Sequence, residues 1–206
     1  MRISVTELDA LRLYRSEDWM TLPMLLDRFR GEGEENEAMR AGTAFHGFLE
    51  HAQAGSSIDW LEHDGYTFEI DCNAELVIPR VRECKTERTF TIDGLEVTVV
   101  GKADTLGGRE VGDYKLSADF DAENYTDALQ WRTYLMLFDA DKFTYTVFPH
   151  KRKGKTITIQ AVEQMSFYRY EGLEEDVMRA IKDLTRFLVE HLPERITAGD
   201  EKRLTF

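Results

Sequence analysis

An aspartate and a lysine stand two positions apart in the segment REVGDYKLS, residues 109–117. The branched and aromatic residues around Asp113 and Lys115 are typical of a buried strand, where an unpaired charge is costly. A second acid, Asp104, precedes them, and a Gly-Gly pair at 107–108 lies between the two segments. Glycine pairs of this kind connect the strands of tight hairpins. The sequence therefore predicts a hairpin that carries two acids and a lysine.

The predicted register of this hairpin decides which side chains share a face. If the two glycines form the loop, Lys102 lies opposite Asp113 and Asp104 lies opposite Val111. Side chains alternate between the two faces of a strand. Asp104, Asp113 and Lys115 then point to one side of the sheet, with the two acids as diagonal neighbours roughly 7–8 Å apart between Cα atoms.

Two carboxylates at this spacing repel each other unless a cation lies between them. Oxygen ligands suit Mg²⁺ or Mn²⁺, and a lysine beside such an ion can orient an attacking water or neutralise a phosphoryl group. Metal and lysine aimed at one point are suited to phosphodiester hydrolysis. The alternative is a surface hairpin whose charges pair across the strands, Lys102 with Asp113 among them. The hairpin alone does not separate these two interpretations.

Helical segments on either side of the hairpin carry further polar residues. The helix expected over residues 36–53 places His46 and Glu50 on one face, because they are four residues apart. A helix downstream of the hairpin places Gln130 and Tyr134 at the same spacing. Each pair taken alone is more often an ordinary surface or core pair than part of a functional site.

The order of these parts resembles the RecB-type exonuclease branch of the PD-(D/E)XK nuclease superfamily. A helical histidine is followed by Gly-x-x-Asp (GKAD, 101–104), Asp-x-Lys (DYK, 113–115) and Gln-x-x-x-Tyr (QWRTY, 130–134). Each motif is weak alone, but four in this order on helix, strand, strand and helix are considerably more specific. The resemblance covers about residues 40–138.

The resemblance implies a role for each matching residue. The implied metal ligands are His46, Asp104, Asp113 and the backbone carbonyl of Tyr114. The implied catalytic group is Asp104, Asp113, Lys115, Gln130 and Tyr134, with Lys115 as the catalytic lysine. The glutamine and the tyrosine would lie beside the site and position the nucleic-acid backbone or the lysine.

Other residues of the sequence either match or depart from the pattern of this family. Glu87 matches an acidic position often seen in this branch, whereas Glu50 matches no motif position. Asp113 stands where many members of the superfamily have Glu, and Asp is the residue typical of the RecB branch. Cys72 and Cys84 are the only cysteines, which excludes a four-cysteine iron–sulfur cluster. No Walker A sequence is present, so we expect no helicase motor within this sequence.

The function implied by the resemblance is that of a metal-dependent DNA nuclease, with an exonuclease of phage recombination or DNA repair as the first choice. It would use one or two Mg²⁺ or Mn²⁺ ions. Its implied partners are DNA, a phage recombination or single-strand annealing protein, and further copies of the chain in a homo-oligomer. One alternative is a catalytically silent relative that binds DNA or a protein partner. Another is an acidic α+β protein of unknown role in which the order of the motifs is accidental.

The elements that must position these residues describe one domain over residues 1–206. Apolar residues at helical spacing predict a helical region over 1–55, and strand-like segments predict a sheet over 56–162 with an inserted helix at 124–139. A C-terminal helix and tail follow over 163–206. The predicted fold class is α/β (α+β), with a central mixed β-sheet flanked by helices. The resemblance adds the expectation of a restriction-endonuclease-like core with an N-terminal helical region.

The composition describes a globular protein, with 42% hydrophobic and 32% charged residues. The 39 acids outnumber the 26 bases, which argues against a general nucleic-acid coat protein but not against an enzyme with a local basic strip. No run of about eighteen apolar residues occurs and the first residues lack a secretory signal, so we expect a cytoplasmic protein without a membrane segment.

The densest basic stretch is HKRKGK, residues 150–155, at an expected turn between two strands. A functional interpretation makes Lys151, Arg152 and Lys153 a phosphate-binding tip, with Arg132 helping. Exposed hairpin turns are also basic for no functional reason, so this interpretation is at best even with the simpler one. Trp131 can stack on a base, but on an amphipathic helix it is more often a core residue.

Overall fold

A computed structural model describes residues 1–33, 35–51, 60–72 and 81–197 of the chain. Its strands are β1 (Arg2–Ser4), β2 (Trp60–His63), β3 (Tyr66–Ile70), β4 (Arg82–Ile92), β5 (Leu95–Gly107), β6 (Glu110–Ser117), β7 (Lys142–Lys153), β8 (Thr156–Ile159) and β9 (Glu163–Tyr168). Its helices are α1 (Val5–Ser16), α2 (Leu22–Arg30), α3 (Glu37–His51), α4 (Ala122–Thr126), α5 (Leu129–Leu137), α6 (Leu173–His191) and α7 (Glu194–Thr197).

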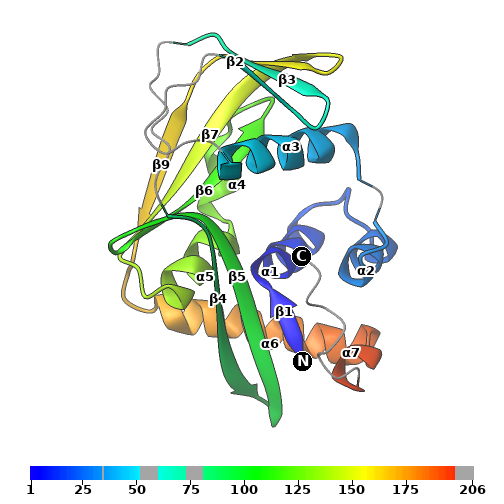
Figure 1. Cartoon of the computed structure of the whole chain (residues 1–206). Helices are drawn as coiled ribbons and strands as arrows, with labels where there is room; N and C mark the ends of the chain where they lie inside the picture. The colour runs from blue at the N-terminus through cyan, green and yellow to red at the C-terminus, as the bar shows by residue number, and fades with distance from the viewer. Residues whose placement is uncertain (34, 52–59, 73–80, 198–206) are drawn as a thin grey trace.

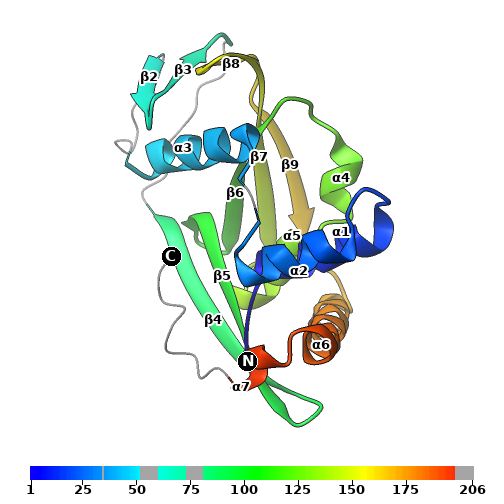
Figure 2. The same cartoon turned by 90° about the vertical axis from the view of Figure 1, so that its right-hand side faces the viewer.

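Within these residues the strands form one nine-stranded mixed sheet in the order β1-β5-β6-β7-β8-β3-β2, with β4 added to β5 and β9 added to β7. The pairs β1–β5, β6–β7 and β3–β8 are parallel, and the remaining pairs are antiparallel. Helices flank the sheet (Figures 1 and 2). The predicted fold class, a mixed α/β structure with a central mixed sheet, is confirmed.

The described residues contain two hydrophobic cores. The larger core joins the sheet to α1, α5 and α6, and includes Phe143, Tyr145 and Val147 of β7. The smaller core lies beneath α3 and includes Tyr114 and Phe148. Figure 1 shows α3 in the upper half of the molecule and α1, α5 and α6 below it. Among the described helices, none is both long and apolar enough to cross a membrane.

Local sequence signals mark the start of α1 and both ends of α2. Ser4 caps α1 in a capping box: the Glu7 amide donates to Ser4 Oγ, and the Ser4 amide donates to Glu7 Oε2 at 2.7 Å. Thr21 caps α2, and that helix ends at Gly31, whose φ of 74° is readily adopted only by glycine.

The structure differs from the predicted elements in three places. Residues 2–4, within the region predicted as helical, form β1 beside β5, and residues 163–168, within the predicted C-terminal helix and tail, form β9 beside β7. The helix predicted over 124–139 is divided into α4 and α5. Part of the strand predicted for ELVIPRVREC, residues 75–84, lies outside the described residues.

The hairpin of β5 and β6 is short, and its strands separate after three residue pairs. These pairs run from Gly107–Glu110 at the turn to Thr105–Gly112. The loop is therefore formed by residues 108 and 109, and the predicted loop of Gly107 and Gly108 is wrong by one residue. Gly108 adopts a φ of 60°, which suits its position in the loop. One residue beyond the last pair, Asp104 and Asp113 stand opposite each other where the two strands fork.

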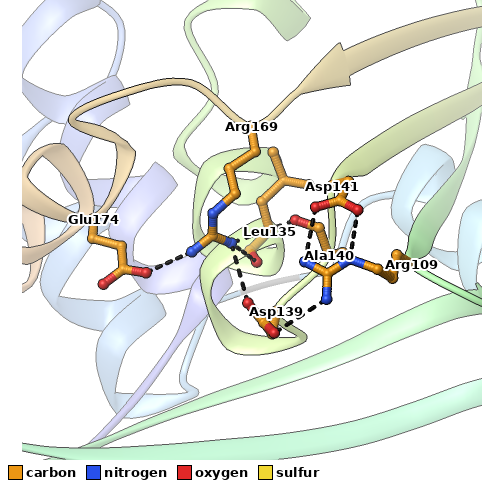
Figure 3. A network of polar contacts seen from close by, with 7 residues as sticks. All are labelled: Arg109, Leu135, Asp139, Ala140, Asp141, Arg169 and Glu174. Atoms are coloured by element: carbon orange, nitrogen blue, oxygen red, sulfur yellow. Dashed lines mark hydrogen bonds and ion pairs between the residues drawn. The ribbon is translucent and has the colours of Figure 1, made fainter.

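The turn of this hairpin is tied to the segment just before the neighbouring strand β7 by charged contacts (Figure 3). The Arg109 guanidinium donates to both oxygens of Asp141, at 2.5 and 2.8 Å, and to Asp139 at 3.3 Å. Arg169, which follows β9, donates to the carbonyl of Leu135 at 3.0 Å and to Glu174 at 2.5 Å. Through Asp139 and Arg169 the contacts link the turn of the hairpin to α5 and α6, although exposed pairs of this kind add little stability.

Gly112 offers a direct test of the packing at the fork. A Cβ at this position would lie 2.5 Å from Thr105 Oγ1 and 3.0 Å from the Thr144 carbonyl oxygen. We expect Gly112→Ala to lower the free energy of unfolding by about 1–3 kcal/mol, measured by urea denaturation. Gly107→Ala is the control in the same hairpin, because no atom lies within 4 Å of its added Cβ. Equal stability of the two variants would contradict the packing described here.

Candidate active site

Asp104 lies at the fork between β5 and β6. Its carboxylate takes the place of the backbone acceptor that a longer β5–β6 ladder would supply. Its Oδ2 accepts a hydrogen bond from the backbone amide of Tyr114 at 2.6 Å, where the ladder has ended. The same oxygen lies 3.3 Å from Nδ1 of His46, which α3 presents from the other side. Burial lowers the pKa of His46, the Asp104 carboxylate raises it, and the net effect is a raised pKa. The contact thus favours the charged form of His46.

Asp113 is the more deeply buried acid of the fork. Its Oδ1 accepts a hydrogen bond from Gln130 Nε2 at 2.7 Å, and its Oδ2 lies 2.6 Å from Lys115 Nζ. Burial raises the pKa of Asp113 to about 6, although the Lys115 ammonium lowers it. A carboxyl group with such a pKa binds protons in competition with any other cation near neutral pH.

Lys115 lies beside both the acids and an aromatic wall. Burial lowers its pKa, and Asp113 with Asp104 raises it by a greater amount, so that Lys115 stays charged. Its Nζ lies 5.9 Å from the centre of the Tyr145 ring, at the outer limit of a cation–π contact. The lysine side chain remains about one-third exposed. The Lys115 ammonium group is charged, is fixed by Asp113 and is still accessible from solvent, so it can bind an anionic substrate.

Glu83 is a site residue that the sequence analysis missed. Ligand atoms of His46, Glu83 and Asp104 all lie within 4.8 Å of one another. Glu83 adopts a φ of 54°, a rare conformation for a residue other than glycine. Its carboxylate forms an ion pair with Lys102. Positive φ values in non-glycine residues are more frequent at functional sites than elsewhere.

Glu87, the acid that the sequence favoured on this strand, lies away from the site. It pairs with Val100 in the β4–β5 ladder and forms a 2.7 Å ion pair with Arg2. The sequence contained the signal that separates the two acids. The Asp-Gly turn at 93–94 implies a two-residue loop, and counting back from it places Glu83, not Glu87, across from Asp104.

The two predicted motifs Gly-x-x-Asp and Gln-x-x-x-Tyr meet in a single contact. A Cβ on Gly101 would lie 2.9 Å from the Tyr134 ring, so only glycine leaves room for the tyrosine. The Tyr134 hydroxyl donates to the Lys102 carbonyl at 2.6 Å, and burial raises the pKa of this phenol. Tyr134 therefore holds α5 against β5 three residues before Asp104.

Gln130 is held in place by a side chain from the first helix. The Asp9 carboxylate of α1 accepts hydrogen bonds from the backbone amides of Leu129 at 2.7 Å and Gln130 at 2.9 Å. Because Ala128 at the N-cap of α5 has no side-chain acceptor, Asp9 caps the helix from another element. The Tyr145 hydroxyl donates to Gln130 Oε1 at 3.2 Å, which leaves the amide NH₂ free to bind Asp113.

The donor set of the fork fits a divalent metal ion. Imidazole nitrogen and carboxylate oxygens from His46, Glu83 and Asp104 converge, and such mixed sets bind divalent cations including Mn²⁺. Asp113 stands outside that group of three, bound to Lys115 and Gln130, although its charge raises the pKa of His46. The residues that would hold an ion are therefore His46, Glu83 and Asp104, with Asp113 across the fork.

Tyr114 takes part in the site through its backbone. Its amide binds Asp104, whereas its side chain packs in the core beneath α3. The role of its carbonyl as a metal ligand stays a prediction.

The predicted pairing of Lys102 with Asp113 is wrong. Lys102 faces Lys85 in the β4–β5 ladder, and its side chain forms an ion pair with Glu83.

The predicted nucleic-acid contacts fall into two groups. Lys151, Arg152 and Lys153 are exposed at the β7–β8 turn, as expected for a hairpin tip. Arg132 is committed to the protein: its guanidinium donates to the carbonyls of Thr126 and Ala128, at 3.2 and 2.8 Å. The Trp131 ring is buried and stacks on Phe167, as expected of a core residue.

Comparison with known proteins supports the fold. No protein-family model matches the chain, and no curated protein is significantly similar to it in sequence. The crystal structure of a protein designated SSO0001 is similar with a TM-score of 0.52 at 18% identity, over 90% of this chain and 76% of that one. This likeness shows a shared fold.

Two exonuclease structures are more distantly similar. An alkaline exonuclease from Laribacter hongkongensis, LHK-Exo, gives a TM-score of 0.46 at 13% identity, over 95% of this chain and 93% of that one. A phage-related exonuclease from Haemophilus somnus 129PT gives 0.40 at 9% identity, over 93% and 83% of the two chains. The functional argument therefore rests on the residues of the fork.

Metal binding at the fork should depend on pH in a defined direction. Because the pKa of Asp113 is raised to about 6 and that of His46 is raised from its usual value, protons compete with the ion as pH falls. We expect the affinity for Mn²⁺, measured by isothermal titration calorimetry, to fall at least about tenfold between pH 7.5 and pH 5.5. Glu87→Gln is the control and should leave the whole profile unchanged. An affinity independent of pH in this range would contradict the assignment.

Asp9 should stabilise the protein through α5. We expect Asp9→Ala to cost about 1–2 kcal/mol, because two amides at the start of the helix lose their acceptor. That cost corresponds to roughly 2–8 °C in Tm, measured by circular dichroism. Asp9→Asn keeps one acceptor oxygen and should lose less. Asp18→Ala, in the exposed turn after α1, is the matched control, and an equal loss there would show that Asp9 does not act as a cap.

Proposed function

We propose that the protein is a metal-dependent nuclease that hydrolyses phosphodiester bonds in DNA. The observation that carries this proposal is the fork itself, where Asp104, Asp113 and Lys115 converge with His46 of α3. Buried acids from two strands and a charged lysine at one point serve no packing purpose, because burying charge is costly. They suit the binding of a cation and a phosphate.

The roles of the residues follow from their contacts. A divalent ion bound there would act as a Lewis acid on the phosphoryl oxygens. His46, Glu83 and Asp104 would hold it. Lys115, one-third exposed, would neutralise charge on the phosphoryl group or orient the attacking water.

The remaining motif residues act by positioning. Gln130 binds the Asp113 oxygen that faces away from the lysine, so Asp113 stays aimed at Lys115. Tyr134 and Gly101 keep α5 against β5. These are positioning residues, since their polar atoms are used within the protein.

Finer assignments belong to the same proposal. We assign the chain to the RecB-type branch of the PD-(D/E)XK superfamily, with Mg²⁺ or Mn²⁺ as cofactor and exonuclease action in phage recombination or DNA repair. Lys151, Arg152 and Lys153 would grip the phosphate backbone. Arg132 is not part of this group, because its guanidinium donates to the backbone carbonyls of Thr126 and Ala128.

A cleavage assay tests the proposal. We expect the wild type to degrade end-labelled linear DNA, but not circular DNA, with Mg²⁺ or Mn²⁺ and not with EDTA. Lys115→Ala should lower kcat by about 10²–10³, the usual cost of removing one group that stabilises a developing charge. Lys142→Ala is the matched control, because Lys142 lies on the neighbouring strand with similar exposure and an ion pair to Glu110 at 2.7 Å.

The outcomes separate the alternatives. Cleavage that survives unchanged in Lys115→Ala contradicts the proposed site. DNA binding without cleavage under any metal would favour a catalytically silent protein of the same fold. Degradation of RNA in preference to DNA would correct the substrate while leaving the site intact.

A further inference from the structure

A short series of aromatic rings connects the protein surface to Lys115. The rings of Phe120 and Tyr125 are stacked, with centres 5.8 Å apart and planes 29° apart. Tyr125 in turn contacts Tyr145, with ring centres 4.9 Å apart. Lys115 Nζ lies 5.9 Å from the Tyr145 ring. The surface ring is therefore two ring-to-ring contacts from the aromatic wall of the proposed active site.

Core packing accounts for the inner rings but not for Phe120. Tyr145 is fully buried, and Tyr125 is half-buried against it. Phe120 keeps 36% of its surface exposed, just before α4, a helix that buries none of its residues. A phenylalanine supported on one face by another ring and open to solvent is a ready stacking surface.

The charges around Phe120 select the kind of group that can bind there. Asp119 and Glu123 are exposed beside it, and Asp121 caps α4 through the Glu123 amide at 3.0 Å. These acids repel phosphate, whereas the cationic Lys115 attracts it. The ring thus suits a flat, uncharged group attached to a phosphate that lies at Lys115.

We propose that Phe120, backed by Tyr125, is a base-stacking subsite for the DNA strand whose phosphate lies between Asp104 and Lys115. This inference rests on the proposed nuclease function and extends it to the form of the substrate. A base can stack on Phe120 only when it has left the stack of its own strand. The subsite therefore selects an unpaired base, at a strand end or in single-stranded DNA.

Fluorescence of 2-aminopurine tests the stacking directly. Single-stranded oligonucleotides carrying this base analogue at the 5′ or the 3′ end are titrated in EDTA with the wild type, Phe120→Ala, Phe120→Trp and Tyr168→Ala. Binding is followed by anisotropy of a separate label on the same strand. Tyr168, 64% exposed on β9, is the matched control for loss of a surface ring.

We expect the wild type to quench one of the two labelled ends, because stacking on an aromatic ring quenches the analogue. Phe120→Ala should weaken binding by about 5- to 100-fold and abolish the quenching. Phe120→Trp should restore both, and Tyr168→Ala should change neither. In cleavage of single-stranded DNA with Mn²⁺, Phe120→Ala should raise KM with little change in kcat.

Each contrary result has a distinct meaning. Suppose that the wild type cleaves DNA, and that Phe120→Ala binds the oligonucleotides and quenches 2-aminopurine as strongly as the wild type. The proposed subsite is then wrong, and the nuclease function stands. If the wild type neither binds nor cleaves DNA, the nuclease function fails and the subsite with it. An unchanged Tm of Phe120→Ala shows that any loss belongs to binding rather than to folding.

Discussion

The fork between β5 and β6 is the constraint on which the rest of the structure depends. A strand pair that continued past Thr105–Gly112 would use the Tyr114 amide in the ladder and would leave no space between the strands. Because the strands separate, the Asp104 carboxylate takes that amide instead. A buried polar backbone group is thus satisfied by the side chain that the site needs. The acids meet where the ladder between the two strands ends.

The spacing of the motifs reflects packing as much as chemistry. Gly101 lies three residues before Asp104 because the Tyr134 ring fills the space of its missing side chain. Gln130 lies one helical turn before Tyr134, so its amide reaches Asp113 while the tyrosine rests on β5. The glycine and the tyrosine therefore act as one contact that fixes the distance between α5 and the acids.

The sequence predicted the type of fold and most of the residues that meet, but not the register that brings them together. A Gly-Gly pair allows more than one two-residue loop, and the loop used by the protein includes Arg109, which Asp141 and Asp139 bind. That tertiary contact could not be read from the local pattern. The Asp-Gly turn at 93–94 was less ambiguous, and a register counted from it would have found Glu83.

Other parts of the structure lie beyond local patterns altogether. Asp9 caps α5 from a helix 120 residues away in sequence, and nothing in the spacing around it marks this role. The strands β1 and β9 are short, and their pairing with β5 and β7 decides their conformation more than their own residues do. Arg132 looked free for phosphate because its backbone acceptors do not appear in a sequence.

The balance of charge at the fork explains how a protein with a net charge of −13 can attract a phosphate. Without an ion, Glu83 is paired with Lys102 and Asp113 with Lys115, and Asp104 contacts His46 and raises its pKa, so each carboxylate of the fork has a basic partner. Under the proposed function, a divalent ion held by these residues would add positive charge to the fork. That charge is confined to the fork, beside Lys115, while the acids on the rest of the surface are screened within about 10 Å at ordinary salt. A phosphate group would balance that charge, so the acidic surface and an anionic substrate are compatible.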